Sequence, residues 1–172
     1  MPEPQARSAP PTGGGPPPAP PATADPDRRP DPSDPGPPIA VRLNGIPLGD
    51  LGHRRVDGRL LMALLLRGGP VAEWLTANSV DAAAVQFAFP GCGWPLQPPL
   101  SWRDQPPDPR ERDARLNVWL DDLELGELGD RDTDAPLLWA IARRPACTGR
   151  WLADHGVSAA AVEHAFPNAG LI

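Results

Sequence analysis

Apolar residues recur along this chain at two spacings, one typical of strands and one typical of helices. Alternating apolar positions flank Asn44-Gly45, a dipeptide that strongly favours a β-hairpin. The segment 118–125 alternates in the same way around Asp121-Asp122, which also tolerates a tight turn. Leucine-rich stretches with helical spacing follow both segments. We therefore expect hairpins within residues 40–52 and 117–129, with an irregular segment as the alternative, and helices after each.

Each leucine-rich stretch predicts the first of three short helices. Asp57 and Asp134 stand where an N-cap is expected, because a side-chain oxygen there accepts from the first free backbone N–H groups. Pro136 would then fall in the first turn, where its missing N–H costs nothing. Gly68-Gly69 in one stretch and Pro145 in the other end the predicted helix.

The second and third helices are also predicted from their start signals. Second helices are expected over Pro70–Ala77 and Cys147–Asp154, each with an inward-facing Trp-Leu pair. Asp81 and Ser158 supply the side-chain oxygen that caps the third helix, so we interpret both residues as structural. Prolines end this helix in both places, at Pro90 and Pro167.

These elements come from one sequence that occurs twice, at an offset of 77 residues. Between residues 41–93 and 118–170, 23 of the 53 aligned pairs are identical without a gap, including Trp74/Trp151 and Phe89/Phe166. Self-similarity at a fixed offset indicates one supersecondary unit used twice. The predicted fold is mainly α, with two tandem pseudo-symmetric repeats of about three short helices, each opened by a small β-hairpin. Each repeat is near the lower size limit for folding alone, so we expect the two to pack together.

Composition divides the chain into four parts. Residues 1–38 hold 15 of the 27 prolines and no large hydrophobe after Met1, which predicts a disordered arm. This arm is either a plain spacer or a polyproline II ligand for an aromatic groove. Residues 39–93 and 117–172 are the two repeats, and residues 94–116 form a Pro-rich linker between them.

Charge is distributed unevenly in this acidic chain, whose net charge is −6. Residues 40–93 carry +1 and residues 117–172 carry −5, which favours packing between the repeats, a surface for a basic partner, or simply a solvated acidic face. An acidic chain without a basic stripe is a poor nucleic-acid binder. The longest apolar run is too short to span a bilayer, and no secretion signal is recognisable. We expect a cytoplasmic protein without nucleic-acid or membrane partners.

No constellation typical of an active site is found in the sequence. The three histidines, His53, His155 and His164, do not recur between the copies. Asp130-x-Asp132-x-Asp134 begins like a calcium loop, but Ala and Ile stand where that loop needs Gly and Glu. The absence of lysine excludes a Walker-type phosphate cradle. We therefore expect no enzyme activity, no cofactor and no metal.

The segment Leu51–Pro90 resembles the Clp N-terminal repeat, the doubled helical module in front of Hsp100-type Clp ATPases. The matching features are the Leu51-Gly52-His53 turn, the leucine-rich helix from Asp57, the Gly68-Gly69 break and the Val80-Asp81 cap. The second copy matches at Leu128-Gly129, Asp134–Ala142, Trp151-Leu152 and Gly156-Val157-Ser158. This chain departs from the family at Asn44-Gly45 and Pro47, where the family opens with a long helix, and we expect no ATPase module.

The resemblance implies a stand-alone, non-catalytic binding module that receives adaptors or substrates, as an accessory or decoy factor in Clp-dependent proteolysis. The alternative is a structural or oligomerisation domain unrelated to proteolysis. Trp94 and Trp102 in the linker either pack back on the repeats or contact a partner. The predicted partner-binding residues are Trp94, Trp102, Trp119, Arg54, Arg55, Asp130 and Asp132.

Overall fold

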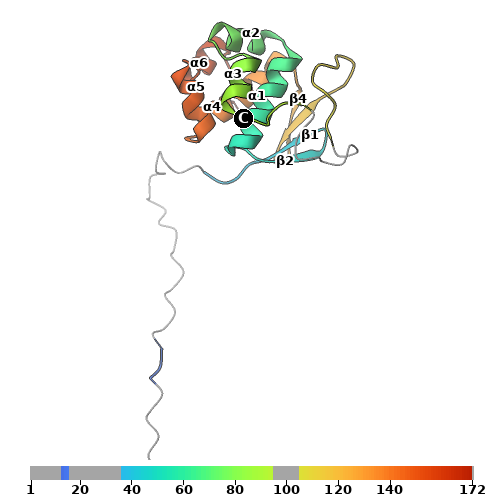
Figure 1. The fold of residues 1–172 in the computed structure, drawn as a ribbon. Coiled ribbons are helices and arrows are strands. Elements are labelled where there is room, and N and C mark those ends of the chain that lie inside the picture. The colour runs from blue at the N-terminus through green and yellow to red at the C-terminus, as the bar shows by residue number, and fades with distance from the viewer. Residues whose placement is uncertain (1–12, 16–35, 95–104, 172) are drawn as a thin grey trace, which may run out of the picture. The chain divides into compact units, whose positions relative to one another are not determined.

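The computed structural model describes residues 13–15, 36–94 and 105–171, and the same series of elements occurs twice in it (Figure 1). The chain consists of two compact units, Met1–Pro30 and Asp31–Ile172. All described helices and strands belong to the second unit. The first half contains β1 (Ala40–Leu43), β2 (Ile46–Asp50), α1 (Arg54–Arg67), α2 (Pro70–Ala77) and α3 (Ala82–Ala88). The second half contains β3 (Asn117–Leu120), β4 (Leu123–Glu127), α4 (Arg131–Arg143), α5 (Cys147–Asp154) and α6 (Ala159–Ala165).

Both predicted hairpins are present, and together they form one antiparallel sheet with the strand order β2-β1-β3-β4. The inner strands come from different halves, with Val41 opposite Leu120 and Leu43 opposite Val118. Each hairpin has a register shift at the same repeat position, between residues 41 and 42 and between residues 118 and 119. The fold is therefore mixed α/β, and the sheet makes the two halves one structure.

The hairpin turns also join the two halves. Asn44 and Asp121, which are repeat-equivalent, have positive φ angles of 51° and 53°, a conformation that Asn and Asp tolerate better than most residues. The Asn44 Oδ1 accepts a hydrogen bond from the Asn117 N–H at 2.7 Å, and the Asp121 Oδ1 accepts from the Ala40 N–H at 2.8 Å. Each turn therefore satisfies the backbone at the start of the other half.

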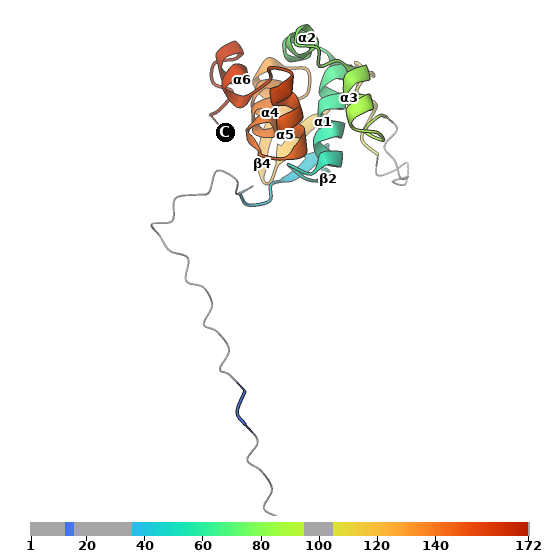
Figure 2. The ribbon, with the colours of Figure 1, turned by 60° about the vertical axis from the view of Figure 1, so that its left-hand side comes forward.

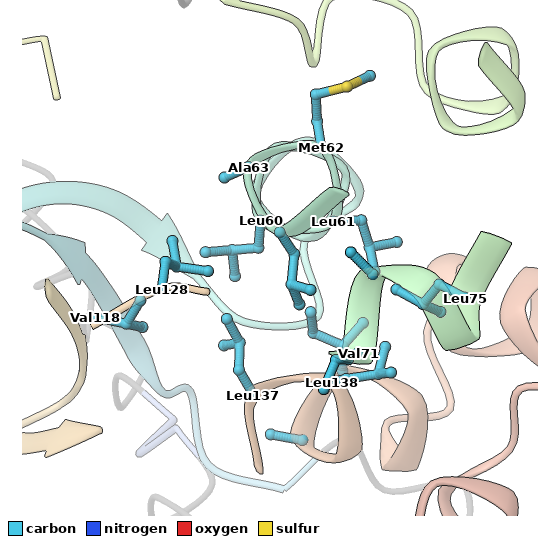
Figure 3. Packing of buried hydrophobic residues seen from close by; sticks show 14 of the residues in the cluster. Leu60, Leu61, Met62, Ala63, Val71, Leu75, Val118, Leu128, Leu137 and Leu138 are labelled. Carbon is cyan, nitrogen blue, oxygen red and sulfur yellow. The ribbon is translucent and has the colours of Figure 1, made fainter. Parts of the chain in front are cut away.

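A single hydrophobic core runs through both halves (Figure 3). Leu60 and Leu61 of α1 point toward Leu137 and Leu138 of α4, and all four side chains are fully buried. Since each half places the same leucine stripe against the other, neither half has a complete core of its own. The predicted packing of the repeats on each other is confirmed.

Aromatic contacts show that the two halves are related by a pseudo-twofold axis. Trp74 lies edge-on to Phe166, with ring centres 5.6 Å apart and an interplanar angle of 82°. The equivalent pair, Trp151 and Phe89, has ring centres 5.2 Å apart and an angle of 80°. In both pairs a tryptophan of one half meets the phenylalanine of the other, and Figure 2 shows α1 and α4 at the centre of the arrangement.

The predicted N-caps of the first helices are wrong. Helix α1 begins at Arg54 and α4 at Arg131, so Asp57 and Asp134 lie at the fourth helical residue. Both carboxylates are fully buried and accept from the backbone N–H of a glycine before the helix, Gly52 at 2.8 Å and Gly129 at 3.1 Å. They fix the turn that leads into the helix. Because α4 begins early, Pro136 is its sixth residue and lies outside the first turn.

The later helix boundaries match the predictions. Helices α2 and α5 have the predicted limits. The Asp81 Oδ1 accepts from the Ala84 N–H at 2.7 Å, and the Ser158 Oγ accepts from the Ala161 N–H at 3.2 Å, so both predicted caps of the third helices are confirmed.

Candidate partner-binding site

An open pocket of about 380 Å³ lies where α1 begins and the chain leaves α3. We call its lining the basic site: His53, Arg54, Arg55, Phe89, Pro90 and Cys92. The three cationic or titratable residues are exposed, whereas Phe89 and Cys92 are buried. The site therefore combines a basic rim with an apolar floor.

Arg54 holds this site together. Its Nη2 donates to the Ala88 carbonyl at 2.6 Å, and its guanidinium carbon lies 5.6 Å from the centre of the Phe89 ring. A guanidinium over an aromatic face is attracted by the ring quadrupole. Arg54 thus fixes the start of α1 against the end of α3, which leaves Arg55 and His53 to contact a ligand.

A further arginine adds positive charge beneath the rim. Arg59, one turn along α1, is 7% exposed, and burial together with the charge of Arg55 lowers its pKa. The positive charges of Arg55 and Arg59 repel each other at this end of α1, so an acidic ligand at the basic site would relieve that repulsion.

The second half carries the same framework with different charges. The repeat-equivalent residues, which we call the acidic site, are Asp130, Arg131, Asp132, Phe166, Pro167 and Ala169. The Arg131 guanidinium carbon lies 5.7 Å from the centre of the Phe166 ring, as in the Arg54–Phe89 pair. Phe166 and Ala169 are buried, and Asp130 and Asp132 are exposed.

Part of the charge difference between the halves lies at these sites. Arg55 and Asp132 differ by two charges, and His53 and Asp130 differ by one when the histidine is neutral. Arg59 and its equivalent Pro136 differ by one more. These three positions supply four charges. The hairpin positions 42/119, 44/121, 45/122 and 47/124 supply four more, and Glu73/Arg150 reverses two, which gives the net six that separate residues 40–93 from residues 117–172.

The structure sorts the predicted partner-binding residues into separate places. Arg54 and Arg55 belong to the basic site, and Asp130 and Asp132 to the acidic site. Trp94 is half-buried and packs against the core. The remaining two predictions are not in either site: Trp119 is half-buried on β3 opposite Arg42, and Trp102 lies outside the described residues.

Sequence reasoning missed the apolar half of the basic site. Phe89 was interpreted only as a position shared by the repeats and Pro90 only as the end of a helix, while His53 was interpreted only as a residue of the turn before the first helix that does not recur. It also missed Phe87 on α3, which is 90% exposed. A position-by-position comparison of charge between the repeats points to the site, because opposite charges stand on an otherwise repeated framework.

The buried carboxylates of Asp57 and Asp134 have a structural role. Burial raises the pKa of Asp57 to about 6, against the opposing influence of its Gly52 hydrogen bond, Thr148 and Arg144. Burial likewise raises the pKa of Asp134 to about 7, and the nearby charge of Asp130 raises it further. Across the described ranges, no three His, Cys, Asp or Glu side chains gather in a way that could hold a metal ion.

Comparisons with known proteins give no match: no family model, no curated protein and no solved structure matches this chain. In the described part of the chain, no single helix is long and apolar enough to cross a membrane. Helices α1 and α2 meet that test only as a pair, bent by 108° at their junction.

Proposed function

We propose that this chain is a non-catalytic protein-binding module whose basic site receives an acidic, partly apolar segment of a partner protein. The observation that supports this most directly is the divergence of the two repeat-equivalent sites. Their framework is the same, with Arg54 or Arg131 stacked on a buried phenylalanine, while Arg55 in one half is Asp132 in the other. A purely structural duplication gives no reason for the charge to reverse at 55/132 beside a retained arginine–phenylalanine framework.

The chemistry of the basic site defines the ligand. Carboxylates pair with Arg55 and His53, and an apolar side chain packs on Phe89 and Pro90. An exposed ion pair contributes only about 0.2–1 kcal/mol, whereas burying one large apolar side chain contributes about 1.5–3 kcal/mol. The apolar contact therefore supplies most of the affinity, and the charges select which segment binds.

The resemblance to Clp N-terminal repeats suggests what the partner is. We propose a Clp ATPase, one of its adaptors or one of its substrates, with this chain as an accessory or decoy factor. The resemblance concerns the helices and their turns; the hairpins β1–β2 and β3–β4 stand where that family opens with a helix.

A peptide-binding measurement tests the binding site. Fluorescence anisotropy with a labelled peptide of alternating acidic and leucine residues should show saturable binding to the full chain. Arg55→Asp should weaken that binding by about tenfold, a change of about 1.4 kcal/mol. Arg112→Asp makes the same charge change in an exposed residue near the other end of α1, where the Glu111 carbonyl accepts from Arg67, and should bind like the wild type. Equal weakening by both variants would contradict a specific site.

A capture experiment tests the Clp link separately. Immobilised wild type and Arg112→Asp should both retain purified Clp ATPase or adaptor, and Arg55→Asp should not. Retention of neither, alongside normal peptide binding, would reject the Clp partner and leave the binding site in place.

A further inference from the structure

We propose that the acidic site of one molecule binds the basic site of a second copy, so that the protein associates head to tail. The two sites are complementary in charge: Asp132 and Asp130 on one copy face Arg55 and His53 on the other. All four residues are exposed in the single chain. Glu73 of α2 and the repeat-equivalent Arg150 of α5 are also exposed and opposite in charge, but they are a single position, whereas the two sites differ in charge at 53/130 and at 55/132.

Apolar surface accompanies the charges on both sites. Phe87 is 90% exposed, two residues before Phe89 of the basic site. Leu171 is 80% exposed, two residues after Ala169 of the acidic site. Large apolar side chains with so much exposure gain free energy when a partner covers them. Each site therefore has an exposed apolar residue two positions away along the chain, which a second copy that covers the charged rim can also cover.

The fold places the two sites at opposite ends of the central helices. The basic site is at the start of α1, and Arg67 at the end of α1 donates to the Leu128 carbonyl, two residues before Asp130 of the acidic site. A helix of 14 residues spans roughly 20 Å. One molecule can therefore use both sites at once, with a different neighbour at each.

Such a contact is heterologous, because it joins two different surfaces. Each added copy leaves one basic and one acidic site free, so the association continues into chains or closes into a ring. The inference rests on the proposed function in one respect, namely that the basic site binds an acidic surface. It adds that a second copy and a foreign partner exclude each other, so association lowers the number of basic sites open to a partner.

Two single variants separate this arrangement from any other self-association. Arg55→Ala removes the charge of the basic site and leaves the acidic site, whereas Asp132→Ala does the opposite. The average mass of the wild type in sedimentation velocity should rise with concentration at low salt and fall at high salt, because exposed ion pairs are screened. Each variant alone should stay monomeric, and an equimolar mixture should form a dimer and nothing larger. Arg42→Ala removes a positive charge from an exposed residue of β1 that belongs to neither site, and this matched control should associate like the wild type.

The opposite results overturn the inference. These are a wild type that stays monomeric at every concentration, variants that associate alone as the wild type does, or a mixture that does not dimerise. Near-ultraviolet circular dichroism establishes that each variant is folded. A monomeric wild type that still binds the acidic peptide overturns the self-association alone. Association of the mixture without any peptide binding overturns the proposed foreign partner alone.

Discussion

Arg67 lies across the backbone of Gly129: its Nε donates to the Leu128 carbonyl at 3.1 Å, and its Cγ would be 2.9 Å from a Cβ on Gly129. The repeat-equivalent Arg144 crosses Gly52 in the same way, with its Cδ 3.2 Å from the position of a Cβ there. Each helix end thus covers the turn before the first helix of the other half. The glycine in that turn is required by this close approach as well as by its positive φ.

We predict that Gly129→Ala lowers the free energy of unfolding by about 1–3 kcal/mol, because the new methyl group meets Arg67 and the φ of +98° strains an L-residue. Urea unfolding measures the change. Gly91→Ala has a similar φ of +84° but no atom within 4 Å of the added methyl group, so it isolates the backbone contribution. An equal loss in both variants would show that the Arg67 contact is irrelevant.

The stability of the protein should fall as pH rises from acid to neutral. The folded-state pKa values of Asp57 and Asp134 are raised from 3.8 to about 6 and about 7, so the folded state binds more protons than the unfolded state in this range. The stabilising contribution is complete below the unfolded pKa of 3.8 and is lost as pH rises through the folded values. For Asp134 the effect is on the order of 4 kcal/mol.

Urea unfolding at several pH values measures this dependence in the wild type and in Asp134→Asn. The asparagine keeps an oxygen that accepts from the Gly129 N–H but does not titrate, so the slope of stability against pH should be shallower. Asp132→Asn changes an exposed carboxylate two residues away and serves as the control. Identical slopes for wild type and Asp134→Asn would count against a buried, protonated Asp134.

The edge-on pairs of aromatic rings should couple the two halves energetically. A double-mutant cycle on Trp74→Ala and Phe166→Ala should give a coupling of about 0.5–1.5 kcal/mol. The pair Trp151 and Phe89 should give a similar value, since its geometry is nearly the same. Trp74→Ala combined with Phe87→Ala should be additive, because Phe87 is 90% exposed. Additivity in the first two cycles would contradict a shared core.

Cutting the connection between the halves should not separate them. A protease site inserted within residues 95–104 and then cleaved should leave two fragments that elute together on gel filtration. The pairing of β1 with β3 and the leucines shared by α1 and α4 hold them in place. The uncleaved insertion variant provides the reference elution volume, and two separate peaks after cleavage would disprove this expectation.

Elements with local signals were predicted well from the sequence. Asn44-Gly45 favours a hairpin through its own turn chemistry, and Asp81 and Ser158 cap helices through a hydrogen bond three residues away. The joining of two hairpins into one sheet has no such signal, because β1 and β3 are 73 residues apart at their closest ends.

The first helices show where a local rule failed. An aspartate near the start of a helix can be its N-cap. It can also lie within the helix and accept a hydrogen bond from a backbone N–H of the turn that precedes the helix. Asp57 takes the second role, and the N-cap position is held by His53, whose side chain makes no capping bond. Likewise, Arg55 and Asp132 were both predicted as partner-binding residues, and the offset of 77 aligns them, but only the structure shows the pocket beside Arg55.

The inner pair of strands, one from each half, has an evolutionary consequence. If two separate copies of a single repeat associated as these halves do, symmetry would give both ends of the dimer the same surface. Once both repeats belong to one polypeptide, a mutation alters one end and spares the other. The fused protein can therefore have two ends with different surfaces, while its core keeps the pseudo-twofold symmetry.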